Sequence, residues 1–190
     1  MNITSILTLL GIFAGPVIAL VSTSWFHRNN TRRASRITAS YLAQHLDEFA
    51  YECAEVISDN ELYSNSNGAA GSQTTAVPPL EKWPEAVDLG LVEPAVLSRV
   101  MSLRLKRTLS ERRVKYWWDV AGDPSLMPEE TGEQCGVLGS EALELARILR
   151  SGAGLPDPNY GQFHWDVSEI LSEQKDGASR LKAEENEDLK

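Results

Sequence analysis

Residues 94–121 have the sequence PAVLSRVMSLRLKRTLSERRVKYWWDVA, which predicts the central element of the fold. Pro94 suits the first turn of a helix, and Gly122 and Pro124 end it, so we expect one long helix here. Apolar residues follow two stripes along it. One stripe comprises Val96, Val100, Leu103, Val114, Trp118 and Ala121, and the other comprises Leu97, Met101, Leu105, Leu109 and Tyr116. Because two apolar sides need cover on both, we expect this helix to be sandwiched at the centre of the domain.

The residues before this helix predict a second helix and a linker. Apolar side chains recur from Ala39 onward at spacings of three and four, which predicts an amphipathic helix over 34–62. No proline or glycine occurs between Val17 and Gly68, so this helix can continue from the N-terminal stretch. Residues 63–79 are rich in Ser, Asn, Gly and Pro, a composition typical of a flexible linker.

The residues after the long helix predict shorter helices joined by loops. Three glycines in 132–139 favour a flexible connector, and Ser140 caps a helix over 141–150. Residues 165–174 predict a last short helix, and the acid-rich 177–190 predicts a solvated, disordered tail. No stretch alternates apolar and polar residues as a strand does. We therefore expect an all-α fold, a small irregular helical bundle spanning 80–176.

The N-terminal 26 residues carry no charged side chain. Residues 3–26 would form a helix about 36 Å long, enough to cross a hydrocarbon core of about 30 Å. A cleaved signal peptide is the alternative, but it needs positive charge before a shorter apolar stretch, and here every arginine follows. We expect an uncleaved signal-anchor over 1–26. Gly11 and Gly15 match a small-residue motif that lets two membrane helices pair.

A basic juxtamembrane segment follows the anchor and predicts its orientation. Trp25 suits the headgroup level, and Arg28, Arg32, Arg33 and Arg36 come next, with anionic lipid headgroups as their expected partners. The arginine side of an anchor stays in the cytoplasm. We therefore expect a short N-terminus outside and a cytoplasmic domain. Two cysteines in 190 residues suit a reducing compartment.

The charge distribution excludes some classes of protein and suggests one surface. The chain has 18 basic and 27 acidic residues and a net charge of −9, which excludes a uniformly basic nucleic-acid binder. The basic residues nevertheless concentrate in 94–118. Pairing with acids such as Glu48, Glu52 and Glu55 within the fold is the simplest explanation. A lipid or partner face is the alternative, made by Arg104, Lys106, Arg107, Arg112, Arg113 and Trp117.

The tryptophans leave two interpretations open. Trp83, Trp117, Trp118 and Trp165 can fill the core of a domain with few other large residues. They can instead form an exposed aromatic patch for a partner protein, since tryptophan is enriched at interface hot spots.

No catalytic, cofactor or metal motif stands out. His45 and Glu48 lie one helical turn apart, but a helical metal site needs more such pairs. Cys53 falls on an apolar stripe and is expected in the core, whereas Cys135 falls in the expected 132–139 connector, where it could be exposed. The sequence favours a non-enzymatic, membrane-tethered module that binds an unidentified partner protein. A membrane-active effector that self-associates through its anchor and a tethered enzyme are the alternatives.

Overall fold

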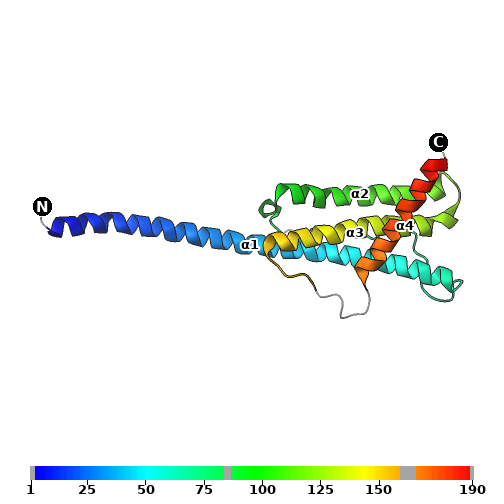
Figure 1. Cartoon of the computed structure of the whole chain (residues 1–190), viewed down its shortest axis with the longest axis horizontal. Coiled ribbons are helices and arrows are strands. Elements are labelled where there is room, and N and C mark those ends of the chain that lie inside the picture. The colour runs from blue at the N-terminus through cyan, green and yellow to red at the C-terminus, as the bar shows by residue number, and fades with distance from the viewer. Residues whose placement is uncertain (1–2, 84–86, 159–165, 189–190) are drawn as a thin grey trace.

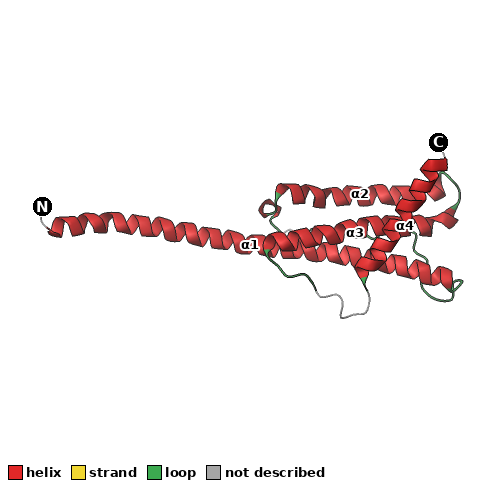
Figure 2. Ribbon diagram, in the orientation of Figure 1, coloured by secondary structure: helices red, strands yellow, loops and turns green. Residues whose placement is uncertain are grey.

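The computed structural model describes the backbone of residues 3–83, 87–158 and 166–188, and the side chains of 23, 25–83, 87–158 and 166–177. It contains four α-helices and two short 3-10 helices (Figures 1 and 2). The α-helices are α1 (Ile3–Asn65), α2 (Pro94–Asp119), α3 (Met127–Ala153) and α4 (Val167–Asp188), and the 3-10 helices are η1 (Leu89–Leu91) and η2 (Pro124–Leu126). The described residues form no strand, and the prediction of an all-α bundle is confirmed.

Helix α1 is continuous over 63 residues, about 95 Å at 1.5 Å per residue. Its N-terminal part projects alone, and its C-terminal half packs in the bundle (Figure 1). The side chains of 1–22, which carry the anchor prediction and Gly11 and Gly15, lie outside the described residues. Among the residues described, no helix is long and apolar enough to span a bilayer.

Helix α3 lies between α1 and α2 and is the centre of the bundle (Figure 1). Twelve of its residues are buried, against four of α2. The expectation that 94–121 would be the central helix was therefore wrong. The expected connector over 132–139 was also wrong, because this stretch is helical and its glycines are buried.

The glycines of α3 allow the close approach that this central position requires. A Cβ on Gly139 would lie 2.6 Å from the Leu171 side chain of α4 and 3.1 Å from the Cβ of Cys53 on α1. A Cβ on Gly136 would lie 3.0 Å from the Cβ of Gln174. Helix α4 therefore crosses α3 almost in backbone contact, where a side chain would separate them.

Residues 69–83, here called the strap, run back from the end of α1 towards the start of the bundle. Val77 is 2% exposed in the core, and Asn60 of α1 both donates to the Thr74 carbonyl (3.0 Å) and accepts from its N–H (2.7 Å). Arg107 of α2 donates to the carbonyls of Val77 (3.1 Å) and Pro78 (2.9 Å). Much of the expected flexible linker therefore packs between α1 and α2, in a position that another helix could fill.

The two cysteines meet in the core, and the ends of the chain are less fully described. Cys53 and Cys135 are both buried free thiols, and a hydrogen bond joins them. Cys53 is in the core as expected, whereas the expected exposure of Cys135 was wrong. Backbone helix continues in α4 to Asp188, and the side chains of 178–190, where the tail was predicted, lie outside the described residues, as does Trp165.

Candidate interaction surfaces

One apolar stripe of α2 faces solvent. Met101, Leu105, Leu109 and Tyr116 are 46%, 63%, 52% and 50% exposed. They occupy one side of the helix, since residues four apart lie on neighbouring turns. We call these four residues the outward stripe. The opposite side, with Val100, Leu103 and Val114, is buried against α3 and the strap. Only one of the two predicted stripes is therefore covered.

The basic residues of α2 pair mainly with α3. Arg99 bonds to Glu144 (2.9 Å), Lys106 to Glu141 (2.7 Å) and Arg113 to Glu130 (2.6 Å). Internal pairing therefore accounts for much of the basic charge. The partners named from the sequence were wrong, because no described ion pair joins α2 to Glu48, Glu52 or Glu55 of α1.

Two further arginines of α2 hold the strap. Arg104 lies over the ring of Trp83, with its Cζ 5.8 Å from the ring centroid, and donates to the Glu81 carbonyl (3.4 Å). Arg107 bonds to the strap carbonyls and to Glu111 (3.1 Å). Arg112 is different: it is exposed between Leu109 and Tyr116, and the described residues provide it with no hydrogen bond or ion pair. It places an unneutralised positive charge on the outward stripe.

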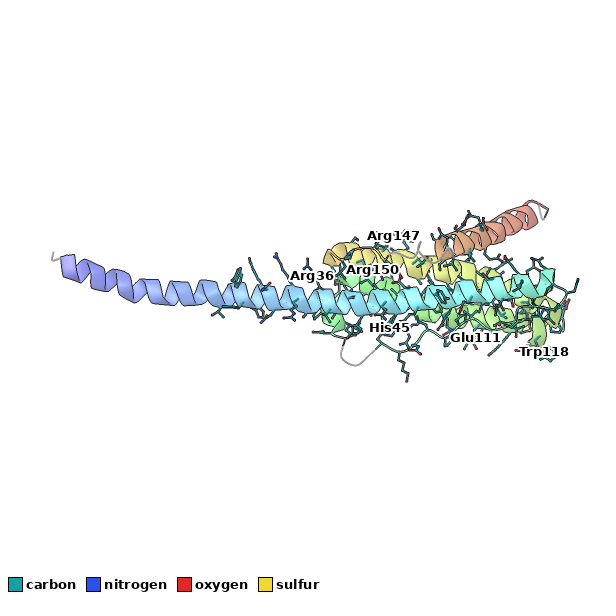
Figure 3. The ribbon with its side chains drawn as sticks, turned by 90° about the horizontal axis from the view of Figure 1, so that it is seen from below. Arg36, His45, Glu111, Trp118, Arg147 and Arg150 are labelled. Carbon is teal, nitrogen blue, oxygen red and sulfur yellow. The ribbon has the colours of Figure 1, made fainter. Side chains whose placement is uncertain are left out.

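The end of α2 is aromatic and partly exposed. Trp117 packs edge-on against Tyr116 (5.9 Å between centroids) and donates from its indole N–H to Glu130 (3.3 Å). Trp118 is 62% exposed at the far end of the bundle from the N-terminus (Figure 3). Of the four tryptophans considered from the sequence, Trp83 and Trp117 are half-buried and Trp118 extends the exposed apolar surface.

A buried carboxylate joins α2 to α3, and sequence reasoning missed it. Glu130 is 7% exposed and accepts hydrogen bonds from Arg113, Trp117 and Gln134, and Gln134 in turn accepts from Ser110 (2.6 Å). This satisfies the carboxylate oxygens, which burial requires. Because 132–139 was predicted to be a loop, the four-residue spacing of Glu130 and Gln134 did not indicate that they share one helix face.

A second buried pair joins α3 to α1. Arg150 donates two hydrogen bonds to the carboxylate of Asp47, and the two side chains are 13% and 10% exposed. Figure 3 places Arg150 close to Arg36 and Arg147, at the end of the bundle nearest the projecting part of α1. The pair is 103 residues apart in sequence, so no local pattern could reveal it.

The outer face of α1 is acidic. Glu52 lies near Glu48, Glu55 and the strap residue Glu81, and partial burial together with these carboxylates raises the pKa of Glu52 above its ordinary value. Tyr41 and Tyr51 are exposed on the same face. The bundle thus presents a basic apolar surface on α2 and an acidic one on α1.

The predicted membrane-interface residues line the exposed part of α1. Trp25, Arg28, Arg32 and Arg33 are exposed beside the projecting segment. Arg36 reaches the bundle, where its Nε donates to the Ala153 carbonyl at the end of α3 (2.9 Å). These residues therefore mark the junction between the projecting helix and the bundle.

The side chains most often used in metal binding and catalysis lie apart or are buried in the part of the chain that the structure describes. No three His, Cys, Asp or Glu side chains among them are grouped to hold a metal ion. His45 lies 3.5 Å from Glu48 and packs edge-on against Trp83. Burial, with the adjacent Cys135 thiol, raises the pKa of Cys53 well above its usual range, so this thiol stays protonated and is a poor nucleophile.

Comparison with known proteins finds no family model, curated protein or solved structure that matches this chain.

Proposed function

We propose that the chain is a non-enzymatic single-pass membrane protein whose cytoplasmic bundle docks a partner protein on the outward stripe of α2. The observation that carries this proposal is the stripe itself. Four large apolar side chains follow one side of α2 over four turns and are about half exposed, while the helix buries its opposite side. A contiguous exposed apolar surface of this kind is typical of an interaction site.

The anchor and its orientation belong to the same proposal. The uncharged residues 1–26 followed by four arginines support insertion with the N-terminus outside and the bundle in the cytoplasm. The adjacent thiols Cys53 and Cys135, unpaired by a disulfide, suit a reducing compartment.

The geometry of the bundle supports a protein rather than lipid on the stripe. Helix α2 runs along α1 in Figure 1. If α1 continues out of a bilayer, the outward stripe stands along the membrane normal and cannot lie flat on the headgroups. The bundle would then reach about 60 Å from the membrane, because residues 26–65 rise about 1.5 Å each.

Charge selects the kind of partner. Arg112 lies within the stripe, whereas Lys115 beside it is paired with Glu111 (3.0 Å). Two copies packing α2 against α2 would therefore enclose two unneutralised arginines in one interface. An amphipathic helix with acidic residues flanking its apolar side would instead complement both the apolar side chains and Arg112. The proposed occupant is such an acidic helix.

Site-specific photocrosslinking in intact cells tests this proposal. A photoreactive residue at position 105 or 109 of the full chain is expected to capture one partner through an acidic helical peptide. The same residue at position 55, on the outer face of α1, is the matched control and should not capture that partner. Met101→Glu on the crosslinking chain should abolish capture by repelling an acidic helix.

Two outcomes overturn the proposal. Absence of any crosslink from positions 105 and 109 would show that nothing docks on the stripe. Crosslinks to other copies of the chain alone would favour the self-associating effector, and replacing the anchor with an unrelated one should then abolish them.

A further inference from the structure

A large basic crevice lies where α1 enters the bundle. Its volume is about 1010 Å³. Arg32, Arg33 and Arg36 of α1 form one wall, Leu91 of η1 another, and the end of α3 around Gly152 and Gly154 a third. The crevice is separate from the outward stripe, since no residue of α2 lines it.

The charge of this crevice is anomalous for the chain. The protein has 27 acidic residues and a net charge of −9, yet none of the acidic residues that the structure describes lines the crevice. Arg32 and Arg33 are exposed, and neither forms an ion pair or hydrogen bond with any described residue. Of the seven basic side chains of α2, by contrast, three pair with α3 carboxylates and two pair with Glu111 of the same helix. Two neighbouring arginines without a carboxylate partner among the described residues therefore lie at this junction.

The wall formed by α3 is compatible with an anion. The C-terminal end of a helix normally repels negative charge because its last carbonyls are unpaired. Here the Ala153 carbonyl accepts a hydrogen bond from Arg36 Nε (2.9 Å), and the backbone N–H of Gly154, which has a φ of 63°, bonds to Ser151 (3.1 Å). Gly152 leaves open space, since no atom beyond its own turn of helix lies within 4 Å of where its Cβ would stand.

The position of the crevice along α1 matches the depth of lipid headgroups. Arg32 follows Trp25 by seven residues, which is about 10 Å along the helix. The headgroup layer extends about 5–8 Å beyond the hydrocarbon core on each side. Side chains on a helix lean towards its N-terminus, so the arginines lean towards the anchor and shorten this gap. Guanidinium groups match phosphate oxygens in geometry as well as charge.

We propose that this crevice binds the phosphate group of an anionic phospholipid in the membrane that α1 enters. The inference rests on the anchor in the proposed function and is independent of the partner on the outward stripe. A bound headgroup would fix the bundle at a set height and rotation above the bilayer, because Arg36 ties the crevice to α3.

Thermal unfolding of the full chain in zwitterionic micelles tests this inference. Adding phosphatidylglycerol is expected to raise the midpoint of unfolding, whereas an equal amount of phosphatidylcholine should not. Arg32→Gln with Arg33→Gln should weaken the apparent affinity for phosphatidylglycerol about tenfold or more. Arg147→Gln is the matched control, because Arg147 is an exposed arginine of α3 that does not line the crevice, and it should retain the stabilisation.

Three results would overturn the inference. Equal stabilisation by phosphatidylglycerol and phosphatidylcholine would exclude an anionic headgroup as the specific ligand. Equal losses for Arg147→Gln and for a single Arg32→Gln variant would indicate general surface attraction. Stabilisation by inorganic phosphate with none from phosphatidylglycerol would assign the crevice to a free anion. Release of the protein from membranes by alkaline extraction would contradict the anchor itself. This result distinguishes failure of the anchor proposal from failure of the phospholipid site.

Discussion

Helices α2 and α3 are almost equal in length, 26 and 27 residues, but they hold opposite positions in the bundle. Twelve residues of α3 are buried and four of α2. Helix α3 contacts α1, α2 and α4, whereas α2 covers one side of α3 and the strap. The helix whose small residues allow close packing therefore lies at the centre of this bundle. The helix with the surplus of large apolar residues lies at the edge and exposes that surplus.

The largest effect is expected where the central helix meets α1. Arg150→Met should lower the free energy of unfolding by about 3–5 kcal/mol, because it leaves the Asp47 carboxylate buried without its partner. Chemical denaturation of the full chain in detergent, followed by circular dichroism, measures this change. The second variant Asp47→Leu, combined with Arg150→Met, should recover much of the loss.

Arg147→Met is the matched control for that prediction. Arg147 is exposed on the same helix, three residues away, and is labelled beside Arg150 in Figure 3. We expect a change within about 0.5 kcal/mol, as for most surface substitutions. Equal losses for the two variants would show that the Asp47–Arg150 pair has no special role.

The two sides of α2 give the next effect in size. Leu103→Ala should cost about 3 kcal/mol of the free energy of unfolding, because Leu103 is 0% exposed and its removal leaves a cavity. Leu105→Ala, two residues away and 63% exposed, should change it by less than about 0.5 kcal/mol. The same denaturation measurement decides. A comparable cost at Leu105 would mean that the outward stripe is covered within the fold.

Periodicity identified the amphipathic helices but not the order of the layers. The pattern from Ala39 onward predicted the packed half of α1, and the two stripes of 94–121 located α2. Whether the second stripe is covered depends on which helix approaches it, and helix propensity contains no such information. The glycines of 132–139 were interpreted as a loop signal because isolated glycine disfavours helix by about 1 kcal/mol. In α3 the packing of α4 and α1 against their bare backbone outweighs that cost.

The sequence likewise identified the basic residues of the candidate surface but not which of them are paired within the fold. Arg112 was among the basic residues of the alternative lipid or partner face, and the described residues provide it with no ion pair. Lys106 and Arg113 were in the same group but bond to Glu141 and Glu130 of α3. Charge counting cannot separate these cases, because the partners are 35 and 17 positions along the chain and the geometry of the turn between α2 and α3 selects them.

A smaller effect is expected from the glycines of α3. Gly139→Leu should lower the free energy of unfolding by about 2 kcal/mol, because its Cβ alone would come within 2.6 Å of Leu171 and 3.1 Å of Cys53. Gly152→Ala, on the same helix with nothing within 4 Å, should instead raise it by up to about 1 kcal/mol through helix propensity. Opposite signs in thermal denaturation would confirm that close packing retains glycine at position 139, and a loss at both would contradict it.

The smallest effect concerns the acidic outer face of α1, which contrasts with the basic face of α2. Burial and the carboxylates of Glu81, Glu55 and Glu48 raise the pKa of Glu52, so the folded state disfavours its charged form. The resulting loss of stability is complete at neutral pH and is relieved as the pH falls through the raised pKa towards the ordinary value of 4.5. Glu52→Gln should therefore increase the free energy of unfolding at pH 7, by no more than about 0.5 kcal/mol because the side chain is exposed to solvent.

Below pH 4 the variant and the natural chain should unfold alike. Added salt should reduce the difference at pH 7 without removing it, since salt screens the neighbouring carboxylates and leaves the cost of burial. If the difference in the free energy of unfolding persists unchanged at low pH, its cause is the shape of the glutamine side chain. Repulsion among the carboxylates of α1 would then not destabilise the fold.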